Sequence, residues 1–164
     1  MNFQEIKFTE QDLHFMKMAA ELAEENVLRG GGPFGAVIVK NGEIVATGAN
    51  SVTLTNDPTA HAEVNAIRKA CKENNTFNLA GCTIYSSCEP CPMCLSALYW
   101  AGVSRIYFGN TKTDAKNINF DDSFIYDEID KLPEARFIPC VRIDEPEAIK
   151  AFQKWENKSD KIEY

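Results

Sequence analysis

The sequence contains no long apolar run, and this absence limits where the protein can work. None of its 164 residues belongs to an apolar stretch of about 18 or more, the length that a membrane-spanning helix needs. Residues 1–10 are polar and mixed in charge, so they lack the apolar core of a secretory signal. We therefore expect a cytoplasmic protein that has no membrane partner.

Positive charge is also scarce. Lys and Arg number 17 against 24 Asp and Glu, which gives a formal net charge of −7. The longest basic stretch is Arg68-Lys69, whereas a protein that grips a nucleic-acid backbone usually carries a basic stripe that neutralises phosphates. The composition therefore disfavours nucleic acid as a partner and favours a small-molecule substrate.

Histidine is scarce as well, since the chain has only His14 and His61. His14 lies inside a predicted helix with no cysteine nearby, and we interpret it as a partly exposed helical side chain. The six cysteines, by contrast, include a cluster formed by Cys88, Cys91 and Cys94. Because cytosolic thiols stay reduced, such a cluster indicates metal binding or chemistry rather than disulfides.

Hydrophobic periodicity predicts one α/β domain over residues 1–164. We expect helices over residues 10–28, 60–74, 91–100, 121–131 and 146–157, and strands over 34–40, 43–49, 83–87, 103–109 and 137–143. Thr9 and Asp12 form a capping pair before the first helix, and Asn41-Gly42 predicts a hairpin turn between the first two strands. The alternation predicts a three-layer α/β/α arrangement around a central, mixed, five-stranded sheet. The buried face of the first helix is predicted to comprise Leu13, Met16, Ala19, Ala20, Ala23 and Val27.

His61, Cys91 and Cys94 form the candidate metal site. Cys91 lies at the expected N-cap of a helix, Pro92 occupies the first helical position, and Cys94 follows nearly one turn later, so both sulfurs can face one point. The helix N-terminus favours the thiolate form. A catalytic zinc takes three protein ligands and one water. The three residues therefore predict one zinc ion per chain, although iron or cobalt can bind the same donors.

Cys88 forms a second C-x-x-C pair with Cys91, but we assign it to packing. It lies at the end of a predicted strand, before Pro90, whereas Cys91 and Cys94 share the start of one helix. The other three cysteines are isolated and are interpreted as core or surface thiols: Cys71, Cys82 and Cys140.

Glu63 is the candidate proton carrier. Replacing an exocyclic amine by oxygen needs hydroxide, which zinc makes available by lowering the pKa of a bound water to about 7. It also needs protons moved from water to a ring nitrogen and to the leaving amine, and one carboxylate can do this. Residues two apart on a helix point about 200° apart, so His61 and Glu63 can converge only at a first turn. The pattern predicts a site where two helix N-termini meet.

The segments 58–63 (Pro-Thr-Ala-His-Ala-Glu) and 88–94 (Cys-Glu-Pro-Cys-Pro-Met-Cys) carry the H-x-E and P-C-x-x-C signature of zinc nucleobase deaminases. They resemble the cytidine and deoxycytidylate deaminase-like superfamily. Segments 31–39 and 120–126 and the terminal Glu163-Tyr164 are similar to the short bacterial guanine deaminases. The resemblance implies hydrolysis of guanine at C2, which gives xanthine and ammonia, with zinc as the cofactor.

The resemblance also implies which residues bind the base. Asn50 would hydrogen-bond the purine, Phe34 would pack on it, Trp100 would line the pocket, and Ala62 belongs to the same expected set. A flat base does favour aromatic faces. Each assignment has a structural alternative, because Asn50 can cap a strand, and Phe34 and Trp100 can belong to the core.

Asp122 and Tyr164 complete the residues that the resemblance implies. Asp122 would act as a second proton-handling or recognition carboxylate, which suits the donor edge of guanine at N1 and the amine, and Tyr164 would act as a lid. The resemblance further implies a homodimer that exchanges residues of about 145–164, so that both side chains serve the partner's site. Alternatively, Asp122 is a first-turn helix charge and Tyr164 a frayed terminus.

Other functions remain open at this point. The same zinc motif occurs in enzymes that act on tRNA adenosine or on cytosine, and an RNA substrate would show strongly salt-dependent binding. A non-enzymatic zinc module would carry a fourth protein ligand in place of the open water position.

Overall fold

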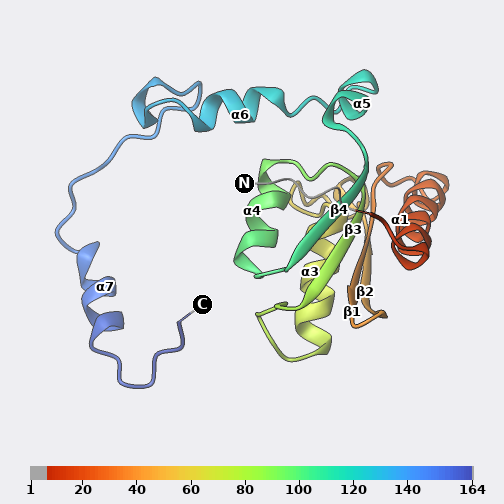
Figure 1. Ribbon diagram of the computed structural model, residues 1–164. Coiled ribbons are helices and arrows are strands. Elements are labelled where there is room, and N and C mark those ends of the chain that lie inside the picture. The colour runs from red at the N-terminus through yellow and green to blue at the C-terminus, as the bar shows by residue number, and fades with distance from the viewer. Residues whose placement is uncertain (1–6, 164) are drawn as a thin grey trace. The chain divides into compact units, whose positions relative to one another are not determined.

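The computed structural model describes residues 7–163 as two compact units, Met1–Asp122 and Ser123–Tyr164, here called unit 1 and unit 2. Unit 1 contains the sheet and the helices that cover it (Figure 1). Its elements in chain order are α1 (Glu10–Leu28), β1 (Gly35–Lys40), β2 (Glu43–Ala49), α2 (Val52–Thr55), α3 (Ala62–Glu73), β3 (Cys82–Cys88), α4 (Pro92–Trp100), β4 (Arg105–Asn110) and α5 (Lys112–Asn117).

The sheet is mixed and has the strand order β2-β1-β3-β4. β1 pairs antiparallel with both β2 and β3, and β3 pairs parallel with β4. Asn41 and Gly42 join β1 to β2 with φ angles of 52° and 81°, the positive values that a two-residue hairpin turn needs. The predicted hairpin and mixed sheet are therefore confirmed.

The predicted fifth strand is wrong, because the described residues form a sheet of four strands. Residues 137–143 adopt no regular structure in unit 2, and their apolar side chains are exposed. Pro139 has no N–H to donate to a neighbouring strand, and an apolar run becomes a strand only when a partner edge pairs with it. The description of unit 2 by itself includes no such partner.

Unit 1 has three layers, with α1 on one face of the sheet and α3 and α4 on the other (Figure 1). Because side chains alternate along a strand, Val37 and Val39 of β1 pack on the α1 side, whereas Ala36 and Ile38 pack on the α3 side. Gly48 lets β2 approach the start of α3, since a side chain there would clash with the backbone of Ala62 and Ala66. This close approach places the first turn of α3 directly against the sheet.

Helix α1 begins and ends where the sequence predicts, but only part of the predicted face is buried: Ala19 and Ala23. The buried residues are Phe15, Ala19, Ala23 and Asn26, whereas Leu13 is 61% exposed. At 100° per residue, Leu13 lies roughly 160° around the helix from Phe15. It faces instead an open groove beside β4, here called the β4 groove. The β4 groove is lined by Phe8, Asp12, Leu13, Met16, Tyr85, Arg105, Ile106, Tyr107 and Phe108.

Asp12 ties the start of α1 to the sheet. Its carboxylate accepts hydrogen bonds from the backbone N–H of Thr9 at 2.8 Å, from the Thr9 hydroxyl at 2.7 Å and from the Tyr85 hydroxyl at 2.6 Å. The Asp12 N–H in turn donates to the Thr9 hydroxyl oxygen, so the predicted capping pair is confirmed. These bonds, with the Thr9 hydroxyl first, hold the pKa of Asp12 below its usual value.

We expect Asp12→Ala to lower the free energy of unfolding by about 1 kcal/mol at pH 7, a modest loss because the site lies near the surface. The pKa of Asp12 is lower in the folded than in the unfolded protein, so its contribution is complete above the unfolded value of 3.8 and disappears as pH falls through the folded value. Urea denaturation of both proteins at pH 7 and in acid checks this. A difference between them that widens in acid would contradict the assignment.

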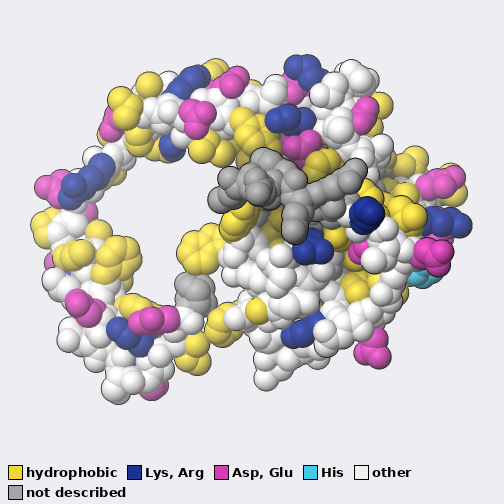
Figure 2. Space-filling model, viewed as in Figure 1, with side chains coloured by type: hydrophobic (Ala, Val, Ile, Leu, Met, Phe, Trp, Pro, Cys, Tyr) yellow, Lys and Arg dark blue, Asp and Glu magenta, His cyan; other side chains and the backbone are white. Residues whose placement is uncertain are grey.

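Unit 2 is built from short helices and open segments. It contains α6 (Ser123–Ile129), the 3₁₀ helix η1 (Pro133–Ala135) and α7 (Ile149–Glu156), so the predicted helices near 121–131 and 146–157 form with shorter bounds. Many apolar side chains of this unit lie open on its surface (Figure 2). They include Phe124, Leu132, Phe137, Ile138, Val141, Ile143 and Phe152. Over the described residues, no helix of either unit is long and apolar enough to cross a membrane.

Candidate active site

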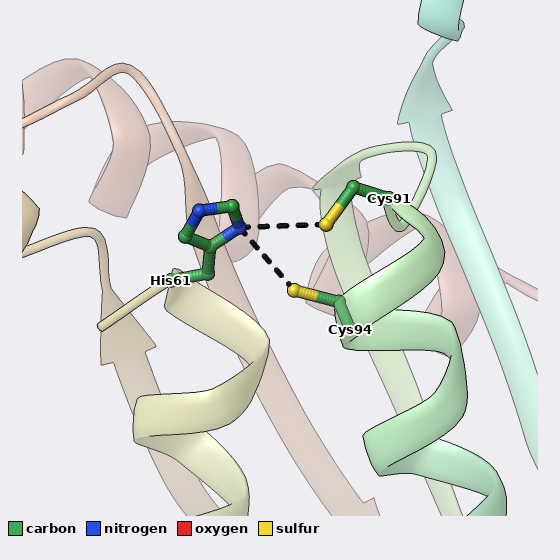
Figure 3. Close-up of side chains that lie close together, drawn as sticks. All are labelled: His61, Cys91 and Cys94. Carbon is green, nitrogen blue, oxygen red and sulfur yellow. Dashed lines mark hydrogen bonds between the residues drawn. The ribbon is translucent and has the colours of Figure 1, made fainter. Parts of the chain in front are cut away.

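The two helices α3 and α4 begin at the candidate metal ligands. His61 is the N-cap residue of α3 and Cys91 that of α4, and Pro92 holds the first position of α4 as predicted. Neither N-cap side chain makes a capping hydrogen bond. The His61 ring points instead at the sulfurs of Cys91 and Cys94 (Figure 3). The predicted meeting of two helix N-termini is therefore confirmed.

The spacing of these three side chains fits a tetrahedral metal. His61 Nδ1 lies 3.6 Å from Cys91 Sγ and 3.4 Å from Cys94 Sγ, and all three donor atoms lie within 4.8 Å of one another. Zinc bonds of about 2.3 Å to sulfur and about 2.05 Å to nitrogen, at tetrahedral angles, place N and S roughly 3.6 Å apart. The nitrogen and two sulfurs therefore have both the chemistry and the separation that zinc requires.

The cluster supplies three ligands rather than four. Within residues 7–163, no other histidine, cysteine or carboxylate joins His61, Cys91 and Cys94 in a metal-binding group. A structural zinc module would fill the fourth position with protein, whereas a catalytic site keeps it for water or substrate. The donor set is thus that of a catalytic centre.

The surroundings prepare the Cys91 sulfur as an anion. Hydrogen bonds from Cys94 first, and then from His61, outweigh burial and lower the pKa of Cys91 to about 4. The same Cys91–Cys94 bond, together with burial, raises the pKa of Cys94. The hydrogen bond with Cys91 also raises the pKa of the His61 ring. A cation bound here would replace the protons that the three side chains otherwise share.

Cys88 lies outside this cluster. Its buried thiol donates to the backbone carbonyl of Thr111 at 3.7 Å, and burial raises its pKa to about 11. A thiol that holds its proton so firmly is a poor metal ligand, which supports its interpretation as a packing residue.

Glu63 lies in the first turn of α3, two residues after His61, and is only 6% exposed. The Ser86 hydroxyl donates to Glu63 Oε1 at 3.0 Å. Burial raises the pKa of Glu63, and the Ser86 hydrogen bond opposes that rise. A buried carboxylate beside a metal-binding cluster is suited to taking up and releasing protons.

Asn50, Phe34 and Ala62 border this region. Asn50 is buried at the end of β2, and its N–H donates to the Phe34 carbonyl at 3.0 Å. The neighbouring Ser51 N–H donates to the Ala60 carbonyl at 2.9 Å, which holds the Asn50 segment beside the residue that precedes His61. Ala62 is fully buried as the first residue of α3. Their roles in binding a base remain predictions.

The Phe34 ring and Asp122 also belong to unit 1. The Phe34 ring meets Phe120 edge to face, with ring centroids 5.0 Å apart. Burial raises the pKa of Asp122, and the nearby charge of Cys91 adds to the rise. Asp122 is therefore close enough to the cluster for their charges to interact.

Trp100 and Tyr164 are not brought to the cluster by the described chain. Trp100 is 72% exposed and ends α4, whereas Cys91 and Cys94 lie at its start, roughly 13 Å and 9 Å away along the helix axis. Tyr164 lies outside the described residues. Both assignments stay predictions.

Three polar residues near the site are absent from the set that the sequence predicts: Asn26, Asn65 and Ser86. Asn26 donates to the carbonyls of Gly32 and Asn50, each at 2.7 Å, and Asn65 donates to the Ala49 carbonyl at 2.8 Å. These two amides hold the backbone around Asn50 from α1 and from α3. The third residue is Ser86, which contacts Glu63. All three are polar side chains at positions where the helix or strand period favours an apolar one. This mismatch in the sequence pattern could have identified them.

Comparison with known proteins places this geometry in a family. The cytidine and deoxycytidylate deaminase zinc-binding region matches residues 9–110. The guanine deaminase of Bacillus subtilis (strain 168) is 55% identical over 151 residues, which are 92% of this chain and 97% of that protein. A solved structure of guanine deaminase from Bacillus subtilis has a TM-score of 0.91 and 52% identity, covering 96% of this chain and 99% of the other. A tRNA-specific adenosine deaminase of Aquifex aeolicus (strain VF5) is 44% identical over 95 residues, 58% of this chain and 63% of that protein.

The family match includes every residue of the metal cluster and the carboxylate beside it. His61, Glu63, Cys91 and Cys94 all lie within residues 9–110. The resemblance to bacterial guanine deaminases, predicted from segments at both ends of the sequence, extends over nearly the whole chain. This chain therefore belongs to the zinc-binding cytidine and deoxycytidylate deaminase family.

Proposed function

We propose that the protein hydrolyses guanine to xanthine and ammonia. The observation that carries the chemistry is the buried Glu63 beside a cluster of three metal donors, the number that a catalytic zinc takes from the protein. The substrate rests on 55% identity to a guanine deaminase over 92% of this chain, whereas two tRNA-specific adenosine deaminases are 44% identical over 58% and 38% identical over 81% of it. The net charge of −7 also opposes an RNA substrate.

In this proposal His61, Cys91 and Cys94 would hold the zinc ion, which would supply Lewis-acid chemistry and lower the pKa of water near neutral pH. Glu63 takes a proton from the attacking water and delivers it to the ring nitrogen next to C2. The hydroxide adds to C2. Glu63 then moves the proton of the new C2 hydroxyl to the amine, and the C2–N bond breaks as the C2 carbonyl forms, which releases ammonia. Burial of Glu63 favours this shuttle, because a carboxylate that readily holds a proton can also donate it.

Recognition of the base is assigned to residues around the Asn50 segment. Asp122 accepts from the N1–H and amine edge of guanine, Asn50 hydrogen-bonds the purine, and Phe34 packs on its face. Two observations support this arrangement: the charge interaction between Asp122 and Cys91, and the hydrogen bonds that hold Asn50 beside Phe34.

A substrate panel tests the function. Zinc-loaded protein is incubated with guanine, adenine, cytosine, cytidine and a tRNA anticodon hairpin while ammonia is measured. We expect ammonia and xanthine from guanine. Ammonia released from another base would support deaminase chemistry but contradict guanine as the substrate. Salt-dependent turnover of the hairpin would favour the tRNA alternative. No release from any of them, with zinc bound, would overturn the proposal.

We also propose that residues 1–164 act as one zinc deaminase domain that forms a homodimer in the cytoplasm and exchanges residues of about 145–164. The exposed apolar side chains of unit 2 and the largely apolar β4 groove of unit 1 are surfaces that a dimer would bury. The six cysteines are all free, which suits a reducing compartment.

Mixing inactive subunits checks the exchange. If Tyr164 serves the partner's site, Glu63→Gln and Tyr164→Ala subunits should each be inactive alone. After refolding together they should recover about a quarter of wild-type activity, because half of the dimers contain one complete site out of two. Light scattering should give about twice the 18.3 kDa chain mass. A monomer, or a dimer without recovery of activity, would contradict the exchange.

A further inference from the structure

Ser86 is a polar side chain in the core of unit 1. It belongs to β3, which is paired on one side with β1 and on the other with β4, and the residue is 2% exposed. Side chains alternate along β3, so Ser86 shares its face with Cys82 and Ile84, which pack in the apolar cluster under α3. The hydrogen bond of the Ser86 hydroxyl in the described chain runs to Glu63 Oε1.

The fold itself does not need this hydroxyl. The neighbouring Ser87 lies on the opposite face of β3, and its hydroxyl accepts the backbone N–H of Gly35 at 3.0 Å, so Ser87 satisfies the backbone of β1. Ser86 satisfies no backbone group in that way, and an apolar side chain would suit its surroundings. A buried hydroxyl costs free energy unless it is paired, and here the partner is the carboxylate of Glu63.

The location of Ser86 suits it to hold a side chain in place. Its backbone is fixed by strand pairing on both sides, whereas Glu63 reaches the site from a helix terminus through a flexible side chain. The Glu63 carboxylate also accepts hydrogen bonds from a backbone N–H and from the Cys94 thiol. A Cys94 thiolate bound to a metal could no longer donate to Glu63, and the oxygen that Ser86 does not hold would then be open to water and the base. Catalytic groups held from a rigid strand keep their geometry better than groups that are free to rotate.

We propose that Ser86 is a positioning residue for Glu63: its hydroxyl fixes Oε1 so that the other carboxylate oxygen carries the protons. This inference rests on the proposed deaminase function. It predicts an effect on turnover rather than on zinc or substrate binding, since Ser86 contacts the proton carrier and not the metal cluster.

The test compares Ser86→Ala with Ser86→Thr and Ser87→Ala in the zinc-loaded full chain. Ser86→Ala should retain one zinc and a KM within about twofold of wild type, while kcat falls roughly 10- to 100-fold because the proton carrier is misplaced. Ser86→Thr keeps the hydroxyl and should restore kcat to within about threefold. Ser87→Ala removes the same group from the other face and should keep kcat within about twofold, although it lowers stability because Gly35 loses its acceptor.

A crystallographic readout separates this inference from the proposed function. In zinc-loaded Ser86→Ala crystals, the Glu63 carboxylate should occupy more than one rotamer, whereas in Ser87→Ala it should keep one. An unchanged, single Glu63 conformer in Ser86→Ala overturns the inference even if no base is deaminated. Unchanged kcat in Ser86→Ala, or an equal loss in Ser87→Ala, overturns it as well. Absence of ammonia from wild-type protein overturns the function alone.

Discussion

Glu63→Gln is expected to stop deamination while zinc remains bound. The amide has the shape of the carboxylate and can still accept the Ser86 hydrogen bond through its oxygen, so the first turn of α3 should keep its position. It cannot take up the proton that the attacking water must lose. General acid–base catalysis is worth about 10²- to 10⁴-fold, and we expect kcat for guanine to fall by at least that factor. Steady-state ammonia release and metal analysis on the same preparation measure both quantities.

Glu73→Gln provides the matched control, because it makes the same chemical change in the last residue of the same helix, where the side chain is exposed. Its kcat should stay within about twofold of wild type. A Glu63→Gln protein that keeps more than about a tenth of the wild-type rate would show that another group carries the protons. Asp122, whose charge interacts with Cys91, would be the first alternative to examine.

The second large effect is expected from the two sulfurs at the start of α4. Cys94→Ser replaces a soft thiolate ligand by a hydroxyl that is a poor donor to zinc, and only His61 and Cys91 would remain. We expect zinc content to fall from one equivalent to near zero after dialysis against a chelator, with loss of deamination. Metal analysis before and after dialysis measures this.

Cys88→Ser is the matched control for this change, since it alters the same kind of atom in the neighbouring C-x-x-C pair. Cys88 keeps its proton and binds the Thr111 carbonyl, so its replacement should leave zinc content at one equivalent. Equal zinc loss from Cys88→Ser and Cys94→Ser would mean that the metal uses a different pair of sulfurs from the one that the geometry brings together.

The cluster of His61, Cys91 and Cys94 was predictable because short-range patterns determine it. Pro92 after Cys91, a second cysteine three residues later, and a histidine that opens a helix are all features within one helical turn, and the structure places each of them at an N-terminus. The hairpin at Asn41-Gly42 was predictable for the same reason, because its turn needs positive φ angles that these residues adopt easily.

Features that depend on distant partners were not predictable in this way. The apolar run 137–143 reads as a strand, but a strand exists only where another edge accepts it, and composition does not reveal that edge. The buried face of α1 was predicted only in part, because Leu13 faces the β4 groove and Asn26 takes an interior position to hold two carbonyls. Ser86 looked like an ordinary strand residue because only the folded chain brings it to Glu63.

The N-cap residues of the helices differ in whether they stabilise the helix or carry candidate metal ligands. α1 and α5 start with a threonine that completes a full capping box, Thr9 and Thr111, whereas α3 and α4 start with His61 and Cys91, which cap nothing. A good N-cap is worth about 1 kcal/mol, so each ligand-bearing helix gives up stability that other residue types would have supplied. The starts of α3 and α4 thus hold side chains suited to a metal at positions where a capping side chain would stabilise the helix.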